Sequence, residues 1–338
     1  MDDPIERSSR DEPQLPSATS TRVEAQLFAS SSDLLVTDEG QRIAGTPVSS
    51  PFRDAVRRFR RNWAAVASVI VVAVLIFMAV FAHYMHTTDP TALDYNSLSQ
   101  GPSATHWFGT DTEGRDEYTR ILYGLRVPFV VSFVGTFLTV VLGLAFGLVA
   151  GLYGGVVDSI LSRFTDFMFA FPAFLLTIII VTLFGGWFDQ NFPNGVGRAI
   201  ILTAVFALVS WPPLMRFVRS LALSLKEQQF IEAARTSGTT NIRIITRHLV
   251  PNVWGLVLVQ GALTVAYIIG TEAVLSILGQ GVNEPNPDLG TMLYDGAHYM
   301  ATNGWLAFFP SLFLTILILA FTFIGDGVRD AVDPRSSQ

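Results

Sequence analysis

Three carboxylates, Asp111, Glu113 and Asp116, lie close together in the sequence and could perform acid–base chemistry. Such catalysis would also need a nucleophile or a metal cluster nearby, and the surrounding segment, His106 to Phe129, offers neither. Turn residues and paired charges fill this segment instead. We therefore expect a compact subdomain in which Asp111, Arg115 and Asp116 satisfy one another.

Other reactive groups are also missing from the sequence. It contains no cysteine, which excludes disulfides, thiolate metal sites and cysteine catalysis. The five histidines show no metal-binding spacing, such as two histidines four residues apart backed by a carboxylate. No GxxxxGK(S/T) phosphate-binding loop is present, so we do not expect this chain to hydrolyse ATP by itself. The sequence predicts no catalytic residue, no metal site and no cofactor on this chain.

A polar and basic stretch lies between two long uncharged runs and is suited to contact with a partner. It extends from Gln229 to Asn252 and reads QFIEAARTSGTTNIRIITRHLVPN. Good helix formers predict a short helix from Leu225 to Thr236. Gly238 stands where a left-handed glycine commonly ends a helix. The stretch therefore begins with a helix and a glycine turn.

A second helix is predicted after the glycine turn. Thr239, Thr240 and Asn241 are residue types that favour a helix N-cap. From there the helix is expected to run as far as Leu249, where Pro251 would stop it. The product is a helix, glycine turn and helix unit held at one face of a membrane.

Two other interpretations of this unit remain open from the residues alone. With Arg243 and Arg247 on its second helix, it could be a DNA-binding helix-turn-helix. A DNA reader needs freedom to enter the major groove and basic charge around it, whereas both ends of this unit enter the bilayer within a few residues. The unit could also be an ordinary amphipathic cytoplasmic loop.

The composition identifies an integral membrane protein. The chain has 338 residues, of which 50% are hydrophobic and only 15% are charged. Residues 1–50 carry nine acidic residues and four arginines, and so account for most of the formal net charge of -6. Few large apolar residues occur there, which predicts a disordered tail.

Six uncharged runs are long enough to cross a bilayer, which takes about 20 residues. They are Trp63 to Ala82, Val127 to Gly155, Phe167 to Phe188, Ala199 to Met215, Val253 to Thr271 and Gly304 to Gly325. Five arginines precede the first run, between Phe52 and Asn62, whereas Gln280 to Asn303 contains no Lys or Arg. This asymmetry predicts cytoplasmic N- and C-termini, because cytoplasmic loops carry an excess of Lys and Arg.

Several residues inside or beside the spans have predicted structural roles. Gly135, Gly143, Gly147 and Gly151 would form a smooth stripe with Thr139 on one helix face, where a neighbouring backbone can approach closely. Prolines interrupt the third, fourth and sixth spans at Pro172, Pro212, Pro213 and Pro310, where they permit kinks.

Ionisable residues near the membrane are candidate functional sites because a charge inside a bilayer is costly. Glu272 lies near the outer end of the fifth span, where it could meet a substrate amine or hydrogen-bond within the outer subdomain. Asp158, Arg163 and Asp166 flank the third span, and Arg163 and Asp166 are spaced to pair on one helix face.

The polar stretch resembles the EAA loop of bacterial ABC importer permeases. The matching residues are Glu232, Ala233, Ala234 and Gly238, followed after nine residues by His248 to Asn252. The general pattern of that family has Ile in place of His248 and Leu in place of Val250. The histidine matches the peptide-importer branch, and Val250 is a departure.

Three further segments resemble the C-type permease of dipeptide, oligopeptide and nickel importers. His106 to Asp116 is similar to its HWLGTDxxGRD signature, Thr271 to Leu293 to its LSFLGLGxxPPxPxWGxML segment, and Gly304 to Arg335 to its terminal span and GDGLRDxxDPR tail. Gln280 and the Asp288-Leu289 pair depart from the second of these patterns. The resemblance covers residues 52–335.

The resemblance implies an all-α membrane protein with six transmembrane helices, the type I ABC importer permease fold, a cytoplasmic EAA coupling helix and a small periplasmic subdomain. The implied domains are a disordered acidic cytoplasmic tail (1–50), a basic flank and first transmembrane helix (51–82), an extracytoplasmic segment (83–126), a permease domain with its coupling loop (127–328, loop 219–252) and a cytoplasmic tail (329–338).

The same resemblance implies a permease subunit of an ATP-driven importer in the bacterial inner membrane. Its partners would be a second permease subunit, two ABC ATPase subunits that bind the ATP and Mg, an extracytoplasmic substrate-binding protein and membrane lipid, with no nucleic acid. Contact with the ATPase would be made by Glu232, Ala233, Ala234, Arg235 and Gly238. Peptides are the expected cargo, with nickel or another small solute as the alternative and a secondary transporter as a further one. The substrate-binding residues stay unassigned.

Overall fold

The long uncharged runs of this sequence form helices because a helix satisfies its backbone hydrogen bonds within its own segment. The computed structural model describes residues 51–85 and 89–332. Contacts divide the chain into two units, Met1–Arg53 and Asp54–Gln338, and the second contains all six candidate membrane spans. The tail predicted over residues 1–50 and the last residues of the tail predicted over 329–338 lie outside the described residues.

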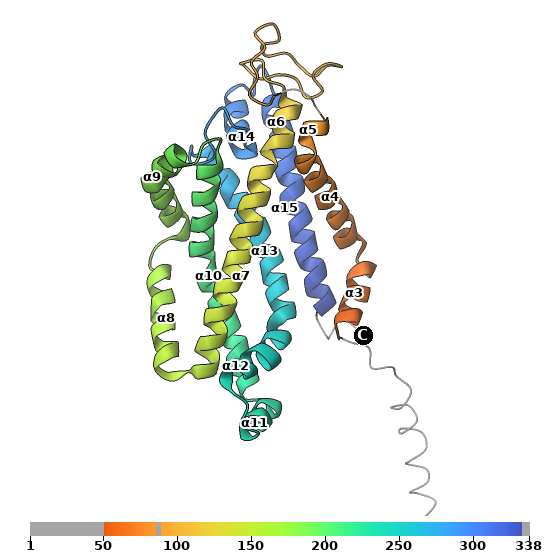
Figure 1. Ribbon diagram of the computed structural model, residues 1–338. Coiled ribbons are helices and arrows are strands. Elements are labelled where there is room, and N and C mark those ends of the chain that lie inside the picture. Colours follow the sequence, from red (N-terminus) through yellow and green to blue (C-terminus); the bar gives the residue numbers. More distant parts are fainter. Residues whose placement is uncertain (1–50, 86–88, 333–338) are drawn as a thin grey trace, which may run out of the picture. The chain divides into compact units, whose positions relative to one another are not determined.

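The described part of the chain is helical apart from its connections, as Figure 1 shows. Its elements, with η1 a π-helical turn, are α3 (Pro51–Arg61), α4 (Trp63–Val80), α5 (Ala82–Met85), α6 (Glu117–Gly124), α7 (Arg126–Tyr153), α8 (Gly155–Phe169), α9 (Ala173–Asn191), α10 (Val196–Lys226), α11 (Gln229–Thr236), α12 (Asn241–Ile244), η1 (Ile245–Leu249), α13 (Val250–Ile277), α14 (Leu289–His298) and α15 (Trp305–Val332).

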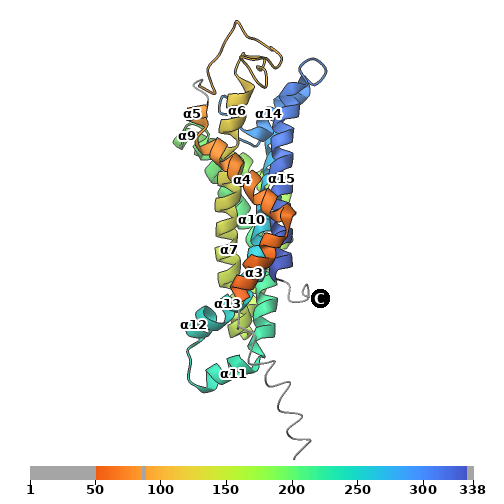
Figure 2. The same ribbon diagram turned by 90° about the vertical axis from the view of Figure 1, so that its right-hand side faces the viewer.

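The structure confirms six helices that are long and apolar enough to cross a membrane. They are Trp63–Val80, Glu117–Tyr153, Ala173–Asn191, Val196–Lys226, Asn241–Ile277 and Trp305–Val332. Several exceed the predicted runs because their ends continue beyond the apolar part. In both views α6 and α14 lie at one end of the spans, and α11 and α12 lie at the other (Figure 1, Figure 2).

The third predicted span differs from a single kinked helix. α8 ends at Phe169 and α9 begins at Ala173, so the apolar run from Phe167 to Phe188 is split between two helices. Pro172 occupies the N-cap position of α9. A proline also disfavours helical geometry in the residue before it, which explains a complete break here. Pro212, Pro213 and Pro310, in contrast, lie inside the unbroken helices α10 and α15.

The predicted glycine stripe of α7 packs against α10 of the same chain. A β-carbon added at three of its glycines would overlap α10 side chains. It would lie 2.8 Å from Leu214 Cγ at Gly143, 2.7 Å from Val218 Cβ at Gly147 and 2.5 Å from Ala222 Cβ at Gly151. Both partners advance by four residues at each step, so the two helices run parallel with their backbones in close approach. The structure thus identifies α10 of the same chain as the neighbour of the glycine stripe, which the sequence alone left open.

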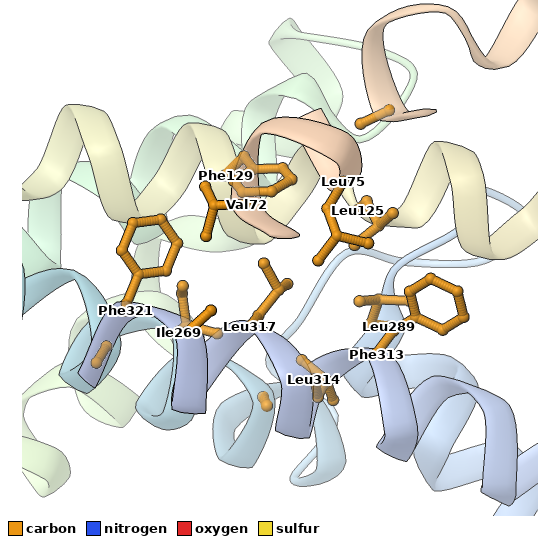
Figure 3. Packing of buried hydrophobic residues seen from close by; sticks show 14 of the residues in the cluster. Val72, Leu75, Leu125, Phe129, Ile269, Leu289, Phe313, Leu314, Leu317 and Phe321 are labelled. Carbon is orange, nitrogen blue, oxygen red and sulfur yellow. The ribbon is translucent and has the colours of Figure 1, made fainter. Parts of the chain in front are cut away.

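The largest hydrophobic cluster surrounds α15 toward the α14 end of the spans (Figure 3). Side chains from α4, α7, α13 and α14 converge on this helix. The residues labelled in the figure are Val72, Leu75, Leu125, Phe129, Ile269, Leu289, Phe313, Leu314, Leu317 and Phe321. This packing holds the first and last spans at the centre of the bundle. Removing any of these buried apolar groups would lose the free energy of its burial and would also leave a cavity.

Candidate functional site

The first helix of the predicted EAA unit is α11, and it is shorter than expected. We predicted a helix from Leu225, but α10 continues through Lys226 and α11 begins at Gln229. Leu225 stays with α10 because its side chain packs against the hydrophobic cluster at the α11 end of the spans. The Gln228 amide donates to the Leu225 carbonyl at 3.0 Å, which closes a tight turn between the two helices.

The glycine turn has the predicted left-handed geometry. Gly238 has a φ of +76°, which a residue with a side chain rarely adopts. Its amide donates to the Arg235 carbonyl at 2.9 Å, and the Thr239 amide donates to the Ala234 carbonyl at 3.0 Å. This pair of bonds is a Schellman motif, which satisfies the last carbonyls of α11. A β-carbon at Gly238 would meet no atom within 4 Å, so the backbone angle alone demands glycine.

The second helix begins as predicted but does not end at Pro251. Thr240 is the N-cap of α12, although its side chain makes no capping bond. α12, η1 and α13 then follow without interruption, and Pro251 lies in the first turn of α13. In the π turn, the Val250 amide donates to the carbonyl of Ile245 five residues earlier. A widened turn just before Pro251 accommodates a residue that lacks an amide hydrogen and crowds the preceding turn.

Three apolar side chains anchor the unit to the spans. Ile231 of α11, Ile244 of α12 and Leu249 of η1 are all fully buried in one cluster. The other buried members come from the ends of α7, α10 and α13, and are Leu148, Leu152, Leu214, Val218, Ala222, Val253 and Val257. The unit therefore rests on three different helices. The sequence analysis missed Ile231, because its neighbour Phe230 is equally apolar, and only the fold shows that Phe230 is 42% exposed.

The residues predicted to contact an ATPase are brought together on one exposed surface. Glu232, Ala233, Arg235 and Gly238 are exposed, and Ala234 is half-buried. Glu232 is exposed although the adjacent Ile231 is buried against the spans, because successive helix residues point in different directions. The arrangement offers a carboxylate, a guanidinium and two small side chains that allow close approach, which suits protein contact rather than catalysis.

Two ion pairs tie α8 to α10 just before the EAA unit. The Arg219 guanidinium donates to Asp158 at 2.6 Å, and the hydrogen bond from Arg219 holds the pKa of Asp158 below its usual range. Arg216 pairs with Asp166. We expected Asp166 to pair with Arg163 on its own helix. That prediction is wrong, because α10 runs beside α8 and presents Arg216 to it.

The predicted cluster at the other end of the spans forms only in part. Arg115 Nε donates to Asp111 Oδ2 at 2.6 Å, as expected. Asp116 has other partners. It caps α6 by accepting from the Thr119 amide at 2.9 Å, and it contacts His106 Nδ1 at 2.9 Å. The N-cap role takes priority because the first amides of a helix have no partner within it.

The loop before α14 completes this charged cluster. Glu284 accepts from Arg120 Nη2 at 2.8 Å and also pairs with Arg115. Both arginines are almost fully buried, and Arg120 is 2% exposed. Buried charges need such partners because an unpaired one would be costly. The connection is long-range, and nothing in the local sequence pattern indicated it.

Glu272 has the structural role that the sequence allowed for it. It is fully buried in α13, where one carboxyl oxygen accepts from the Ser276 hydroxyl at 3.1 Å. The likewise buried Asp288 caps α14 by accepting from the Thr291 amide at 3.2 Å, and burial raises the pKa of Asp288. Glu272 is thus not accessible to a substrate in this conformation.

A cavity of about 510 Å³ lies where α8, α9, α10 and α13 meet near mid-span. The α8–α9 break at Pro172 and the Pro212–Pro213 pair form part of its wall. Its polar groups come from Ser210, Gln260, Thr264 and Tyr267, with apolar side chains around them. A mostly apolar cavity with a few converging polar groups is typical of a small-molecule site. Kinks in a span often border such a cavity, but no residue of the cavity was assigned from sequence.

Two family models match different parts of this chain. Residues 143–338 match the family described as binding-protein-dependent transport system inner membrane component, and residues 50–102 match the N-terminal TM domain of oligopeptide transport permease C. A solved structure of the MetNI methionine ABC transporter in inward-facing conformation is 22% identical, with a TM-score of 0.47 over 62% of this chain and 95% of that chain.

Similar full-length relatives are transport permeases. The dipeptide transport system permease protein DppC of Alkalihalophilus pseudofirmus is 37% identical over 85% of this chain and 90% of its own length. OppC of Escherichia coli K12, an oligopeptide transport system permease protein, is 41% identical over 85% and 92%. GsiD of Shigella flexneri, a glutathione transport system permease protein, is 38% identical over 85% and 92%. This chain belongs to the family of inner membrane components of binding-protein-dependent transport systems, and is a multi-pass permease subunit of that family.

Proposed function

We propose that this chain forms one half of the translocation pathway of an ATP-driven importer of di- and oligopeptides. The relatives support this cargo, because their names concern dipeptides, oligopeptides and glutathione, which is itself a peptide. The mid-span cavity of about 510 Å³ would contribute this chain's part of the pathway. Nickel or another small solute is the alternative cargo for the same architecture.

The orientation that we propose places α11 in the cytoplasm. The end of the spans that holds α3, α11 and α12 carries an excess of basic residues, as the rule for cytoplasmic loops requires (Figure 1). The opposite end has Arg115, Arg120, Arg126 and Arg198. Each is engaged with a carboxylate or a carbonyl, such as Asp189 for Arg198 at 2.6 Å and the Ala79 carbonyl for Arg126 at 2.8 Å. Both termini would then be cytoplasmic.

The observation that carries the coupling role is the different burial of two adjacent residues in α11. Ile231 is fully buried against three spans, whereas Glu232 is exposed. An ATPase subunit that grips the surface formed by Glu232, Ala233, Ala234, Arg235 and Gly238 would therefore pull on the spans through Ile231. The resemblance to importer permeases implies two ATPase subunits that bind the ATP and Mg, and this chain has no phosphate-binding loop of its own.

ATP-driven closure of the ATPase pair would move α11, α12 and η1, here called the coupling unit, together with α10 and α13. Such rigid-body movement is a common way to convert a cavity from one accessible face to the other. A second permease subunit would complete the pathway, and a substrate-binding protein would deliver peptide at the outer face. A secondary transporter would need none of these partners.

Reconstitution tests this proposal directly. The chain is purified from its membrane with whatever remains bound, and the complex is placed in proteoliposomes with ATP inside. We expect ATPase subunits to co-purify, and we expect peptide uptake to depend on both ATP and a binding protein. Uptake of nickel in place of peptide would show that nickel, and not peptide, is the cargo. Transport by the chain alone, without an ATPase, would refute the importer role.

A further inference from the structure

A small polar cavity of about 250 Å³ lies at the outer end of the spans, distinct from the mid-span cavity. The loop before α6, the start of α6, the loop before α14, α14 and the first turn of α15 enclose it. Its lining includes five carboxylates and two guanidinium groups, from Asp111, Glu113, Glu117, Glu284, Asp295, Arg115 and Arg120. Acidic groups outnumber basic ones, so the cavity favours a positive charge.

The two arginines of this cavity are already engaged. Arg115 donates to Asp111 at 2.6 Å and pairs with Glu284, and Arg120 donates to Glu284 at 2.8 Å. These contacts neutralise Asp111 and Glu284. Arg115 is 6% exposed and Arg120 is 2% exposed, so their guanidinium groups cannot turn toward other partners.

Two carboxyl groups in the same cavity have no such partner. Glu117 is 2% exposed, and its Oε1 atom has no hydrogen-bond partner among the described residues. Asp295 is half-buried and receives no side-chain hydrogen bond or ion pair from the part of the chain that the structure describes. Burial and then the neighbouring Glu284 carboxylate raise the pKa of Asp295. A buried carboxyl without a donor is costly, which indicates that a donor comes from elsewhere.

The walls of the cavity also indicate the shape of the missing donor. Among the described residues no group of three His, Cys, Asp or Glu side chains is placed to hold a metal ion. Met292 and Leu306 line the cavity and are each 4% exposed, and Tyr299 lies at its surface. Apolar walls above unpaired carboxyls suit a side chain with a hydrocarbon stem and a cationic tip, as in lysine and arginine.

We propose that this cavity receives a lysine or arginine side chain of the substrate-binding protein when that protein docks on the outer face. The inference rests on the proposed function, which supplies such a partner. The incoming ammonium or guanidinium group would donate to Glu117 Oε1 and Asp295, while its stem packs against Met292 and Leu306. Docking would thereby complete a hydrogen-bond set that the permease leaves open.

The test uses the whole complex in lipid nanodiscs and measures ATP hydrolysis while the peptide-loaded binding protein is titrated. Asp295→Asn removes the charge and keeps the shape. We expect it to raise the binding-protein concentration for half-maximal stimulation by roughly tenfold, because a desolvated charge pair is lost, while the basal rate stays unchanged. Glu117→Gln should act in the same direction.

Asp89→Asn is the matched control. Asp89 is an exposed acid of the same outer segment that does not line the cavity, and the amide oxygen of asparagine can still accept from Thr91 as the carboxylate does at 2.8 Å. We expect no change in the half-maximal concentration. The apparent melting temperature of Asp295→Asn should equal or exceed that of the wild type, since an uncompensated buried carboxyl has been removed.

The possible outcomes distinguish a failure of the docking inference from a failure of the proposed importer function. If the wild-type complex is stimulated and Asp295→Asn behaves like Asp89→Asn, the cavity has no docking role, although the importer function stands. If Asp295→Asn and Glu117→Gln both lower the melting temperature without weakening docking, the two carboxyls are structural and the inference is overturned. If no binding protein stimulates the wild-type complex, the proposed function fails and the inference falls with it.

Discussion

Gly151 of α7 and Ala222 of α10 approach so closely that a β-carbon on the glycine would lie 2.5 Å from the alanine Cβ. The contact belongs to a seam that continues through Gly147 and Gly143 along two parallel helices. The Gly151 end of this seam adjoins the cluster that buries Ile231. The seam therefore fixes the helices that the coupling unit rests on.

Gly151→Val should destabilise the permease by about 1–3 kcal/mol, because the added methyl groups overpack the seam. Thermal unfolding of the purified complex in detergent measures the effect. Gly186→Val in α9 is the control, since a β-carbon there would meet no atom within 4 Å. Equal melting temperatures for the two variants would show that the seam can open at little cost.

A graded series at Gly238 should separate backbone angle from side-chain size. Asparagine tolerates the left-handed conformation, so Gly238→Asn should retain most coupling. Gly238→Val should cost about 1–2 kcal/mol in the turn and lower peptide-stimulated ATPase activity. Gly238→Pro should abolish that activity and peptide uptake, because it also removes the amide that donates to Arg235. Membrane insertion should be unchanged throughout. Loss of coupling that follows side-chain volume instead would contradict this account.

Glu232→Lys and Ile231→Ala should fail in different ways. Reversing the exposed charge at Glu232 should abolish stimulated ATPase activity without changing stability. Truncating the buried Ile231 should cost about 2–5 kcal/mol in the packing of α11, visible as faster amide hydrogen exchange there. Glu227→Lys changes an exposed acid in the turn before α11 and should leave coupling intact. If Glu227→Lys is as damaging as Glu232→Lys, then the contact depends on charge in general and not on this surface.

The Asp158–Arg219 pair predicts a pH dependence of stability. Arg219 hydrogen-bonds to Asp158 and holds its pKa below the usual range, so the folded state binds this proton less tightly than the unfolded state. The stabilisation is therefore complete above the unfolded pKa of about 3.9 and is lost as pH falls through the lower folded pKa. Asp158→Asn should cost about 1 kcal/mol at neutral pH, and the difference from wild type should vanish in strong acid.

Thermal unfolding at several pH values checks that prediction. Arg163→Gln is the control, because Arg163 is exposed on the same helix while Asp166 pairs with Arg216. Its melting temperature should follow the wild type at every pH. A pH-independent difference between Asp158→Asn and wild type would show that the ion pair contributes nothing measurable.

The sequence alone was enough to predict the features that depend on local chemistry. Apolar runs predicted all six spans, and Gly238 predicted the left-handed turn, because glycine adopts that geometry more easily than a residue with a side chain. Glu232 was expected within the first helix of the EAA unit, and the structure places it in α11, where it is exposed. These features need no knowledge of what the rest of the chain contacts.

Features that depend on distant contacts were not predictable in this way. Arg216 replaced Arg163 as the partner of Asp166 because the fold places α10 beside α8. Asp116 was expected to join Arg115 but caps α6, and Glu284 took its place from another loop. Pro251 was expected to end a helix, yet a π turn just before it lets the helix continue. In each case a competing long-range or backbone interaction decided the outcome.

The ion pairs of Glu284 also constrain how this protein is made. Arg120 precedes its partner by 164 residues and Arg115 by 169, so both leave the ribosome long before Glu284 exists. Until four more spans have been inserted, Arg115 has only partners from its own segment, such as Asp111, and Arg120 lacks the Glu284 carboxylate. This charged cluster therefore gains its final set of ion pairs only after Glu284 has been made, near the end of synthesis.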